Sequence, residues 1–212
     1  ALGVAMFDSK YLRFPLLSGV RTDFYFENLT DGMAKFFTGF YSGNCVNHTD
    51  SVSITPTDSS SVLAIYLRYT RNNQTEDYTA GNFNVQLVPT TSGNGKTKKV
   101  MLIGDSLTDA GKYQNYINQY FINDGMKVEW LGTRQSTYGL KHEGRAGWRA
   151  YTYTHYAEVT SSDGEGNAAT NAFWNPTTLS FDFSYYMSQH GYSSADVVFI
   201  NLGTNDYIRG TH

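Results

Sequence analysis

The side chains best suited to chemistry gather in three short clusters in the second half of the chain. These are Gly104-Asp105-Ser106-Leu107, Gly144-Arg145-Ala146-Gly147-Trp148 and Gly203-Thr204-Asn205-Asp206. A serine hydroxyl can attack an acyl carbon, and an asparagine amide can donate a hydrogen bond to the oxyanion that then develops. A glycine can present a bare backbone N–H to the same oxygen. The chemistry that these residue types could perform is acyl transfer.

Each cluster, taken alone, also has an ordinary structural interpretation. Serine, threonine and aspartate before a helix are common helix caps, so Ser106 could be a cap. Gly-Thr-Asn-Asp around Asn205 is typical turn sequence, and the glycines around Gly147 suit a plain loop. The individual patterns therefore leave both interpretations open.

The surrounding pattern predicts where the first and third clusters lie. Val100–Ile103 and Val197–Leu202 are apolar runs typical of strands buried on both faces. Apolar residues at helical spacing predict amphipathic helices over 113–121 and 183–190, and Lys127–Leu131 predicts a further strand. Alternating strands and helices indicate an α/β fold with a parallel sheet, whose strand ends meet at one edge. We therefore expect Ser106 and Asn205 to share a site.

The first half of the chain has a different pattern. Short segments rich in β-formers alternate with turn sequences, which predicts a small antiparallel β-sandwich. The expected strands are 23–26, 51–54, 62–67 and 83–88. A polar stretch over 89–97 suggests a linker, so we expect a jelly-roll-like accessory domain over 1–90 and a second domain over 98–212. Gly95-Lys96-Thr97 lacks the first glycine of a P-loop and precedes a strand, so that interpretation is rejected.

Together, the three clusters resemble the sequence blocks of the SGNH, or GDSL, hydrolases, in the same order. The resemblance covers Lys99 to His212. It implies that Ser106 is the nucleophile and that Gly147 and Asn205 donate to the oxyanion together with the backbone N–H of Ser106. It also implies a flavodoxin-like, three-layer α/β domain, of which this chain carries an incomplete, N-terminal portion.

The general base of that family is a histidine in a later Asp-x-x-His block, which we do not find. None of the five histidines has an aspartate three residues before it; they are His48, His142, His155, His190 and His212. We therefore expect the natural protein to continue for about 60–100 residues. A missing C-terminal segment, or another chain, would complete the site. The alternative of His142 as a local base remains open, but the chain alone should be nearly inactive.

Composition narrows the function classes. A formal net charge of −3 gives no attraction toward nucleic acid or anionic membrane, and no apolar run is long enough to span a bilayer. No cluster has metal-ligand spacing, so we expect neither a metal nor another cofactor. The single cysteine, Cys45, excludes an internal disulfide and suggests a small buried side chain. Asn28, Asn47 and Asn73 begin glycosylation-type triplets, and an extracellular or cell-surface location is expected.

Three functional hypotheses follow. The first is an esterase that removes acetyl or other short acyl groups from carbohydrate, because the 17 tyrosines and 13 phenylalanines suit sugar faces. A β-sandwich ahead of an SGNH domain also resembles the arrangement in some carbohydrate esterases. The second is an esterase acting on lipid or other small esters. The third is a non-catalytic glycan-binding or structural module, such as part of a cell-surface or phage tail protein.

Overall fold

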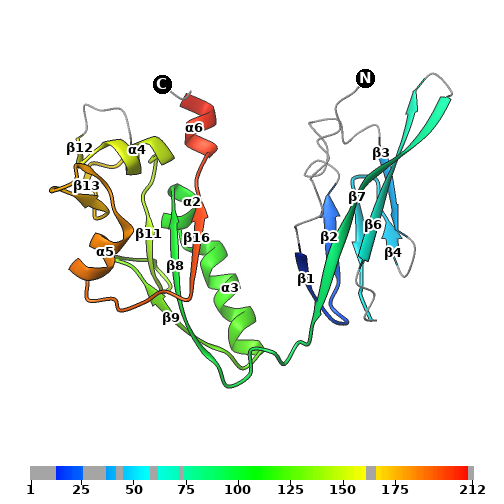
Figure 1. Ribbon diagram of the computed structural model, residues 1–212, viewed down its shortest axis with the longest axis horizontal. Helices are drawn as coiled ribbons and strands as arrows, with labels where there is room; N and C mark the ends of the chain where they lie inside the picture. Colours follow the sequence, from blue (N-terminus) through cyan, green and yellow to red (C-terminus); the bar gives the residue numbers. More distant parts are fainter. Residues whose placement is uncertain are drawn as a thin grey trace. The chain divides into compact units, whose positions relative to one another are not determined.

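The computed structural model describes residues 13–25, 37–41, 45–57, 62–71, 74–160 and 166–209. The chain forms two compact units that divide between Ser92 and Gly93 (Figure 1). Asn28, Asn73 and His212 lie outside the described residues, as does the side chain of Cys45. The third glycosylation-type residue, Asn47, is exposed.

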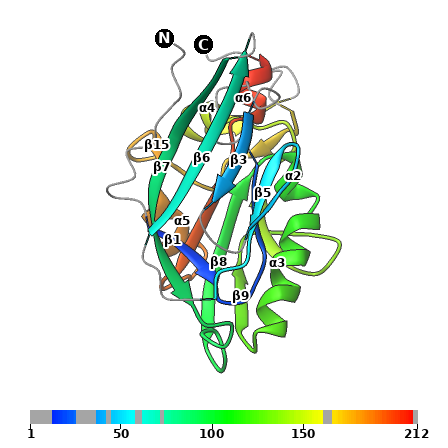
Figure 2. The same ribbon diagram turned by 90° about the vertical axis from the view of Figure 1, so that its right-hand side faces the viewer.

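Among its described residues, the first unit contains two β-sheets. Its described strands are β1 (Arg13–Leu17), β2 (Thr22–Tyr25), β3 (Phe37–Tyr41), β4 (Cys45–Asn47), β5 (Ser51–Ile54), β6 (Val62–Arg71) and β7 (Gln74–Val88). One sheet has the order β1-β7-β6-β3 and the other β2-β5-β4. The long antiparallel pair of β6 and β7 is prominent in Figure 2. β1 runs parallel to β7, so the expectation of wholly antiparallel sheets is wrong for this edge.

β5 is buried along its whole length, including both of its serines. Burial of a hydroxyl is unfavourable unless it forms a hydrogen bond. Ser53 Oγ lies 2.7 Å from His48 Nε2, and Ser51 Oγ donates to Asp50 at 2.9 Å. His48 therefore has a local structural role in the first unit.

The second unit is built on a five-stranded mixed sheet. Its strands are β8 (Thr97–Gly104), β9 (Lys127–Leu131), β10 (Arg134–Gln135), β11 (Lys141–Gly144) and β16 (Val197–Asn201). β8 is central: β16 pairs with one edge, and β9 and β11 pair in turn with the other. These pairings are parallel, whereas β10 is antiparallel to β11. The predicted parallel core is therefore present, with one antiparallel strand added.

Helices and short β-hairpins complete this unit. They are α2 (Ser106–Asp109), α3 (Lys112–Asn123), α4 (Ala150–His155), β12 (Glu158–Val159), β13 (Ala169–Thr170), β14 (Trp174–Asn175), β15 (Ser180–Phe181), α5 (Phe183–Gln189) and α6 (Thr204–Arg209). Alternate side chains of β8 enter two cores. Val100 and Leu102 pack with α3, whereas Met101 and Ile103 pack with α4 and α5. Figure 1 shows α3 on one side of β8 and α4 and α5 on the other.

β16 differs from the sequence expectation of a strand buried on both faces. All five of its residues are exposed, with Ile200 at 68% and Phe199 at 45%. The pairing with β8 satisfies one edge of β16, and Asp196 anchors its start by accepting a bond from the Lys99 backbone N–H at 2.8 Å. Among the described residues, no further strand pairs with the other edge. The apolar side chains of β16 are therefore exposed.

Two glycines at strand ends allow α2 to lie directly against the sheet. A Cβ on Gly104 would overlap Thr108 Oγ1 and lie 2.8 Å from the Asn201 carbonyl oxygen. A Cβ on Gly144 would overlap Asp109 N and lie 2.6 Å from the Thr108 carbonyl carbon. These contacts are too close for any side chain, so glycine is required by space at both positions.

Substitution of Gly144 should therefore be severely destabilising. Gly144→Ala is expected to lower the free energy of unfolding of the second unit by about 3 kcal/mol, because the added methyl group overlaps backbone atoms that cannot rotate away. All three tryptophans of the chain lie in this unit, so their fluorescence in a urea titration reports its unfolding alone.

The matched control is Gly191→Ala, where the φ of +69° is strained but a Cβ has open space. It should cost about 1 kcal/mol. A Gly144→Ala variant that is no less stable than Gly191→Ala would contradict the steric account.

Candidate active site

Three strands of the second unit end in one row. Gly104 of β8 is paired with Gly144 of β11 on one side and with Asn201 of β16 on the other. The Arg145 backbone N–H continues the first pairing by donating to the Gly104 carbonyl at 2.9 Å. The segments that lead to Ser106, Gly147 and Asn205 therefore leave the sheet at the same edge, as the sequence predicted for two of them.

Ser106 is the first residue of α2, and it is exposed. The capping role is taken by its neighbour: Asp105, which is 3% exposed, accepts a bond from the Leu107 backbone N–H at 3.0 Å. Neither the hydroxyl nor the backbone N–H of Ser106 bonds to any described residue. The alternative of Ser106 as the cap is thus wrong, and its hydroxyl is available for chemistry.

Gly147 lies in the loop after β11 with a φ of +80°, a left-handed conformation that favours glycine. The loop is held from outside: the Asn167 N–H donates to the Ala146 carbonyl at 3.0 Å, and the indole N–H of Trp148 donates to the Asn167 carbonyl at 2.8 Å. Within the described part of the chain, the Gly147 N–H has no hydrogen-bond acceptor. It is a backbone donor on a restrained loop.

Asn205 lies in α6, which begins at Thr204, so the Gly-Thr-Asn-Asp sequence forms a helix start here and not an isolated turn. Its Nδ2 donates to the Trp148 carbonyl at 3.1 Å. Because an amide nitrogen carries two hydrogens, a second donor remains. This bond links the third cluster directly to the residue after Gly147.

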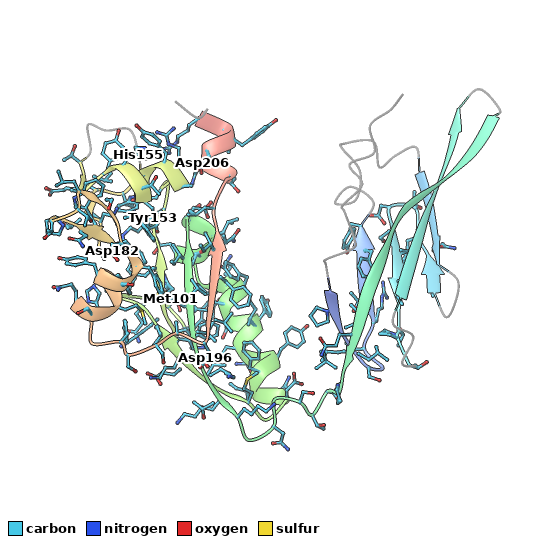
Figure 3. All side chains as sticks on the ribbon, viewed as in Figure 1. Met101, Tyr153, His155, Asp182, Asp196 and Asp206 are labelled. Carbon is cyan, nitrogen blue, oxygen red and sulfur yellow. The ribbon has the colours of Figure 1, made fainter. Side chains whose placement is uncertain are left out.

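The next residue strengthens the same link. Asp206 accepts a bond from the Ala150 backbone N–H at 3.0 Å and lies 3.4 Å from the Tyr151 N–H, so it caps α4. Figure 3 shows Asp206 on α6 beside α4. The two helices that flank the candidate site are therefore joined by charge-assisted hydrogen bonds.

The Tyr153 side chain connects two of the strand ends at the candidate site. It is 2% exposed, and its hydroxyl lies 2.9 Å from the Gly104 carbonyl oxygen and 2.7 Å from the Glu143 carbonyl oxygen. One phenol thus bridges the ends of β8 and β11. Burial raises the pKa of Tyr153 well above its ordinary value, so the hydroxyl remains a donor at all physiological pH values.

A buried ion pair joins Arg145 of the second cluster to Glu143 of β11. Arg145 Nη1 contacts Glu143 Oε2 at 2.5 Å, with the two side chains 5% and 0% exposed. The Thr133 N–H and the Tyr186 hydroxyl donate to the other carboxylate oxygen at 2.5 and 2.6 Å. Burial alone would raise the pKa of Glu143, but the Arg145 charge and these bonds outweigh it and lower the pKa. The carboxylate is therefore held ionised.

His142, the local alternative for a base, forms no hydrogen bond with Ser106. It is fully buried, and its Nδ1 accepts a bond from the Gly144 N–H at 3.0 Å, which leaves the proton on Nε2. Burial lowers the pKa of His142, so it stays neutral. The other described histidines, His48, His155 and His190, form no hydrogen bond with Ser106 either. The described residues thus supply a nucleophile without a bonded base.

Among the described residues, no group of three or more histidine, cysteine, aspartate or glutamate side chains is arranged to hold a metal ion. No described helix combines the length and apolar character needed to cross a membrane.

Comparison with known proteins assigns the family. The model of the GDSL-like lipase/acylhydrolase family matches residues 100–212, which is more than half of the chain. The chain belongs to this family. Its GDSL domain is a hydrolase domain for carboxylic esters, in agreement with the resemblance seen in the three clusters. No curated protein and no solved structure matches the chain.

Several residues of the GDSL domain that position the site escaped the sequence analysis. Tyr153, Asp206 and the Glu143–Arg145 pair all lie within or beside the three clusters. A signal existed for the pair, because charged residues two apart at a buried strand end need a partner. Tyr153 and Asp206 carry no comparable signal, since their partners are backbone groups distant in sequence.

The Glu143–Arg145 pair gives a prediction about stability and pH. Glu143→Gln should lower the free energy of unfolding by about 3 kcal/mol at neutral pH, because it leaves the buried Arg145 charge uncompensated. The folded-state pKa of Glu143 lies below its ordinary value of 4.5. The stabilisation is therefore complete above pH 4.5 and is lost as the pH falls through the lower, folded-state pKa.

Urea titrations from pH 7 to pH 3 with tryptophan fluorescence test this behaviour. Glu129→Gln, which alters an exposed carboxylate on β9, is the control and should leave the midpoint unchanged. A loss of stability in Glu143→Gln that persists undiminished at pH 3 would contradict an ionic origin.

Proposed function

We propose that the protein is a serine ester hydrolase that removes acetyl or other short acyl groups from carbohydrate. Ser106 is the nucleophile, and the oxyanion donors are the N–H groups of Ser106 and Gly147 and the amide of Asn205. The observation that carries this proposal is the common row of Gly104, Gly144 and Asn201, which sends all three segments to one edge.

The proposed reaction has two halves. A base removes the Ser106 proton as Oγ bonds to the acyl carbon, and the carbonyl oxygen becomes an oxyanion. Collapse of this intermediate expels the sugar oxygen, which takes up the proton, and leaves an acyl-enzyme. Water, deprotonated by the same base, then releases the carboxylic acid and restores Ser106. The three donors stabilise the oxyanion in both halves, and none needs to break an existing bond to do so.

The base in this proposal comes from outside the described residues, as a further segment or another chain. The exposed side chains of β16 support this, because an exposed apolar edge strand is unfavourable unless polypeptide covers it. Without the base, the serine hydroxyl stays protonated and reacts slowly. The chain by itself is then nearly inactive.

Carbohydrate is favoured as the substrate by three features. The chain is rich in tyrosine and phenylalanine, whose rings have apolar faces that suit sugars. Its charge of −3 gives no attraction toward anionic lipid surfaces. A β-rich unit precedes the GDSL domain, and we propose that it is a sandwich-type accessory domain. An extracellular or cell-surface location accords with such a substrate.

A second candidate is a non-catalytic glycan-binding or structural module that retains the fold. The observation in its favour is that no described histidine bonds to Ser106. Against it stand the Ser106 hydroxyl and the Gly147 N–H, which have no partner within the described ranges and which a purely structural site has no reason to keep in that state.

The nucleophile is tested on the intact gene product, whose mass is measured first. Ser106→Ala should reduce the hydrolysis of p-nitrophenyl acetate and the release of acetate from acetylated xylan by about 10³-fold or more. Ser188→Ala, an exposed serine on α5, is the matched control and should retain the wild-type rate. Equal rates for wild type and Ser106→Ala would reject the nucleophile and favour the non-catalytic module.

The proposed role of Asn205 is tested by measuring kcat and KM separately. Asn205→Ala should lower kcat by about 10²-fold or more with little change in KM, because the lost donor acts on the transition state. Asn123→Ala, which removes an exposed amide at the end of α3, is the control. A change confined to KM would place Asn205 in substrate binding and contradict the oxyanion role.

A further inference from the structure

A concave site lies on the α5 side of the GDSL domain. It is a pocket of about 590 Å³ whose walls come from the β12–β13 hairpin, the segment around β14, and α5. Asp182, labelled in Figure 3, marks the start of α5 beside it. Ser106, Gly147 and Asn205 do not line this pocket. We propose that it binds a neutral glycosyl unit of a carbohydrate chain, separately from the ester bond that is cleaved.

Two aromatic side chains supply the apolar part of the wall. Trp174 and Tyr185 line the pocket, and both are only partly buried. The chain's other tryptophans, Trp130 and Trp148, are 8% and 0% exposed and belong to the cores. Trp174 is therefore the tryptophan that offers its ring to a ligand, and the C–H face of a sugar ring packs on such a surface.

Arg145 supplies a polar group at the pocket wall. Its side chain is 5% exposed, and among the described residues its Nε has no hydrogen-bond partner. That nitrogen is itself buried, so Arg145 contributes to the wall as a polar side chain held in place by Glu143. A pocket lined by two aromatic rings and by polar side chains matches a ligand with an apolar face and hydroxyl groups around its rim.

The charges around the pocket favour a neutral ligand. Glu143 already balances the Arg145 guanidinium, so a ligand carboxylate would gain no net opposite charge there. Glu158, an exposed carboxylate in the wall, would repel it. The remaining polar wall residues are amides and hydroxyls, such as Gln189, which pair well with sugar hydroxyls, and the imidazole of His190.

This site would add chain binding to the proposed ester hydrolysis. Arg145 lies two residues before Gly147, so the same segment lines the pocket and carries a proposed oxyanion donor. A bound glycan would thereby contact the domain next to the reactive edge. The inference shares its ligand class with the proposed function but does not require turnover, so the two can fail independently.

The experiment measures binding on the chain as it exists. Xylohexaose and cellohexaose are the neutral probes, trigalacturonic acid is the acidic one, and isothermal titration calorimetry gives Kd. At least one neutral probe should bind, change the tryptophan fluorescence of the wild type but not of Trp174→Ala, and bind more tightly than the acidic one. Trp174→Ala should weaken that binding by about tenfold, and Trp174→Phe, which keeps a ring, should restore part of it.

The matched control is Tyr116→Ala, which removes an aromatic side chain that is 67% exposed on α3 and does not line the pocket. It should leave Kd unchanged. The hydrolysis of p-nitrophenyl acetate by the intact gene product should be equal in wild type and Trp174→Ala. No binding of either neutral probe at 10 mM, an unchanged Kd in Trp174→Ala, or tighter binding of trigalacturonic acid overturns the proposal.

Discussion

The close contact between α2 and the sheet is the constraint on which the rest of the GDSL domain depends. Gly104 and Gly144 end neighbouring strands, and both lie against Thr108 and its neighbours without room for a side chain. Because α2 lies directly against the sheet, Ser106, its first residue, lies at the edge of the sheet. The Tyr153 hydroxyl lies close to carbonyl oxygens at the ends of the same two strands and holds these ends together.

A network of hydrogen bonds connects the segments that surround the candidate site. The Asn205 amide bonds to the carbonyl of Trp148, the indole of Trp148 bonds to the Asn167 carbonyl, and Asp206 caps α4. Each of these bonds joins segments distant in sequence, and none uses the Ser106 hydroxyl or the Gly147 N–H. The structure thus restrains the proposed donors while leaving them open, which is the preorganisation that oxyanion stabilisation requires.

The sequence predicted those elements whose pattern lies within one short stretch of residues. The apolar run at 100–103, the helical spacing at 113–121 and the turn-bounded run at 127–131 correspond to β8, α3 and β9. The exposure of β16 was not predictable, because an apolar run has the same composition whether or not its neighbours cover it. The capping by Asp105 in place of Ser106 also depends on backbone geometry that residue types leave undetermined.

The second cluster shows why the two proposed binding surfaces share one short segment. Arg145 is buried with Glu143 on the α5 side, while its own backbone N–H continues the β8 pairing and Gly147 follows at the edge. A buried ion pair is costly to desolvate, but removal of one partner leaves an uncompensated buried charge, so each of the two side chains requires the other. Gly147, two residues further on, has the left-handed backbone conformation. The segment that contributes Arg145 to the pocket wall therefore also carries a proposed oxyanion donor.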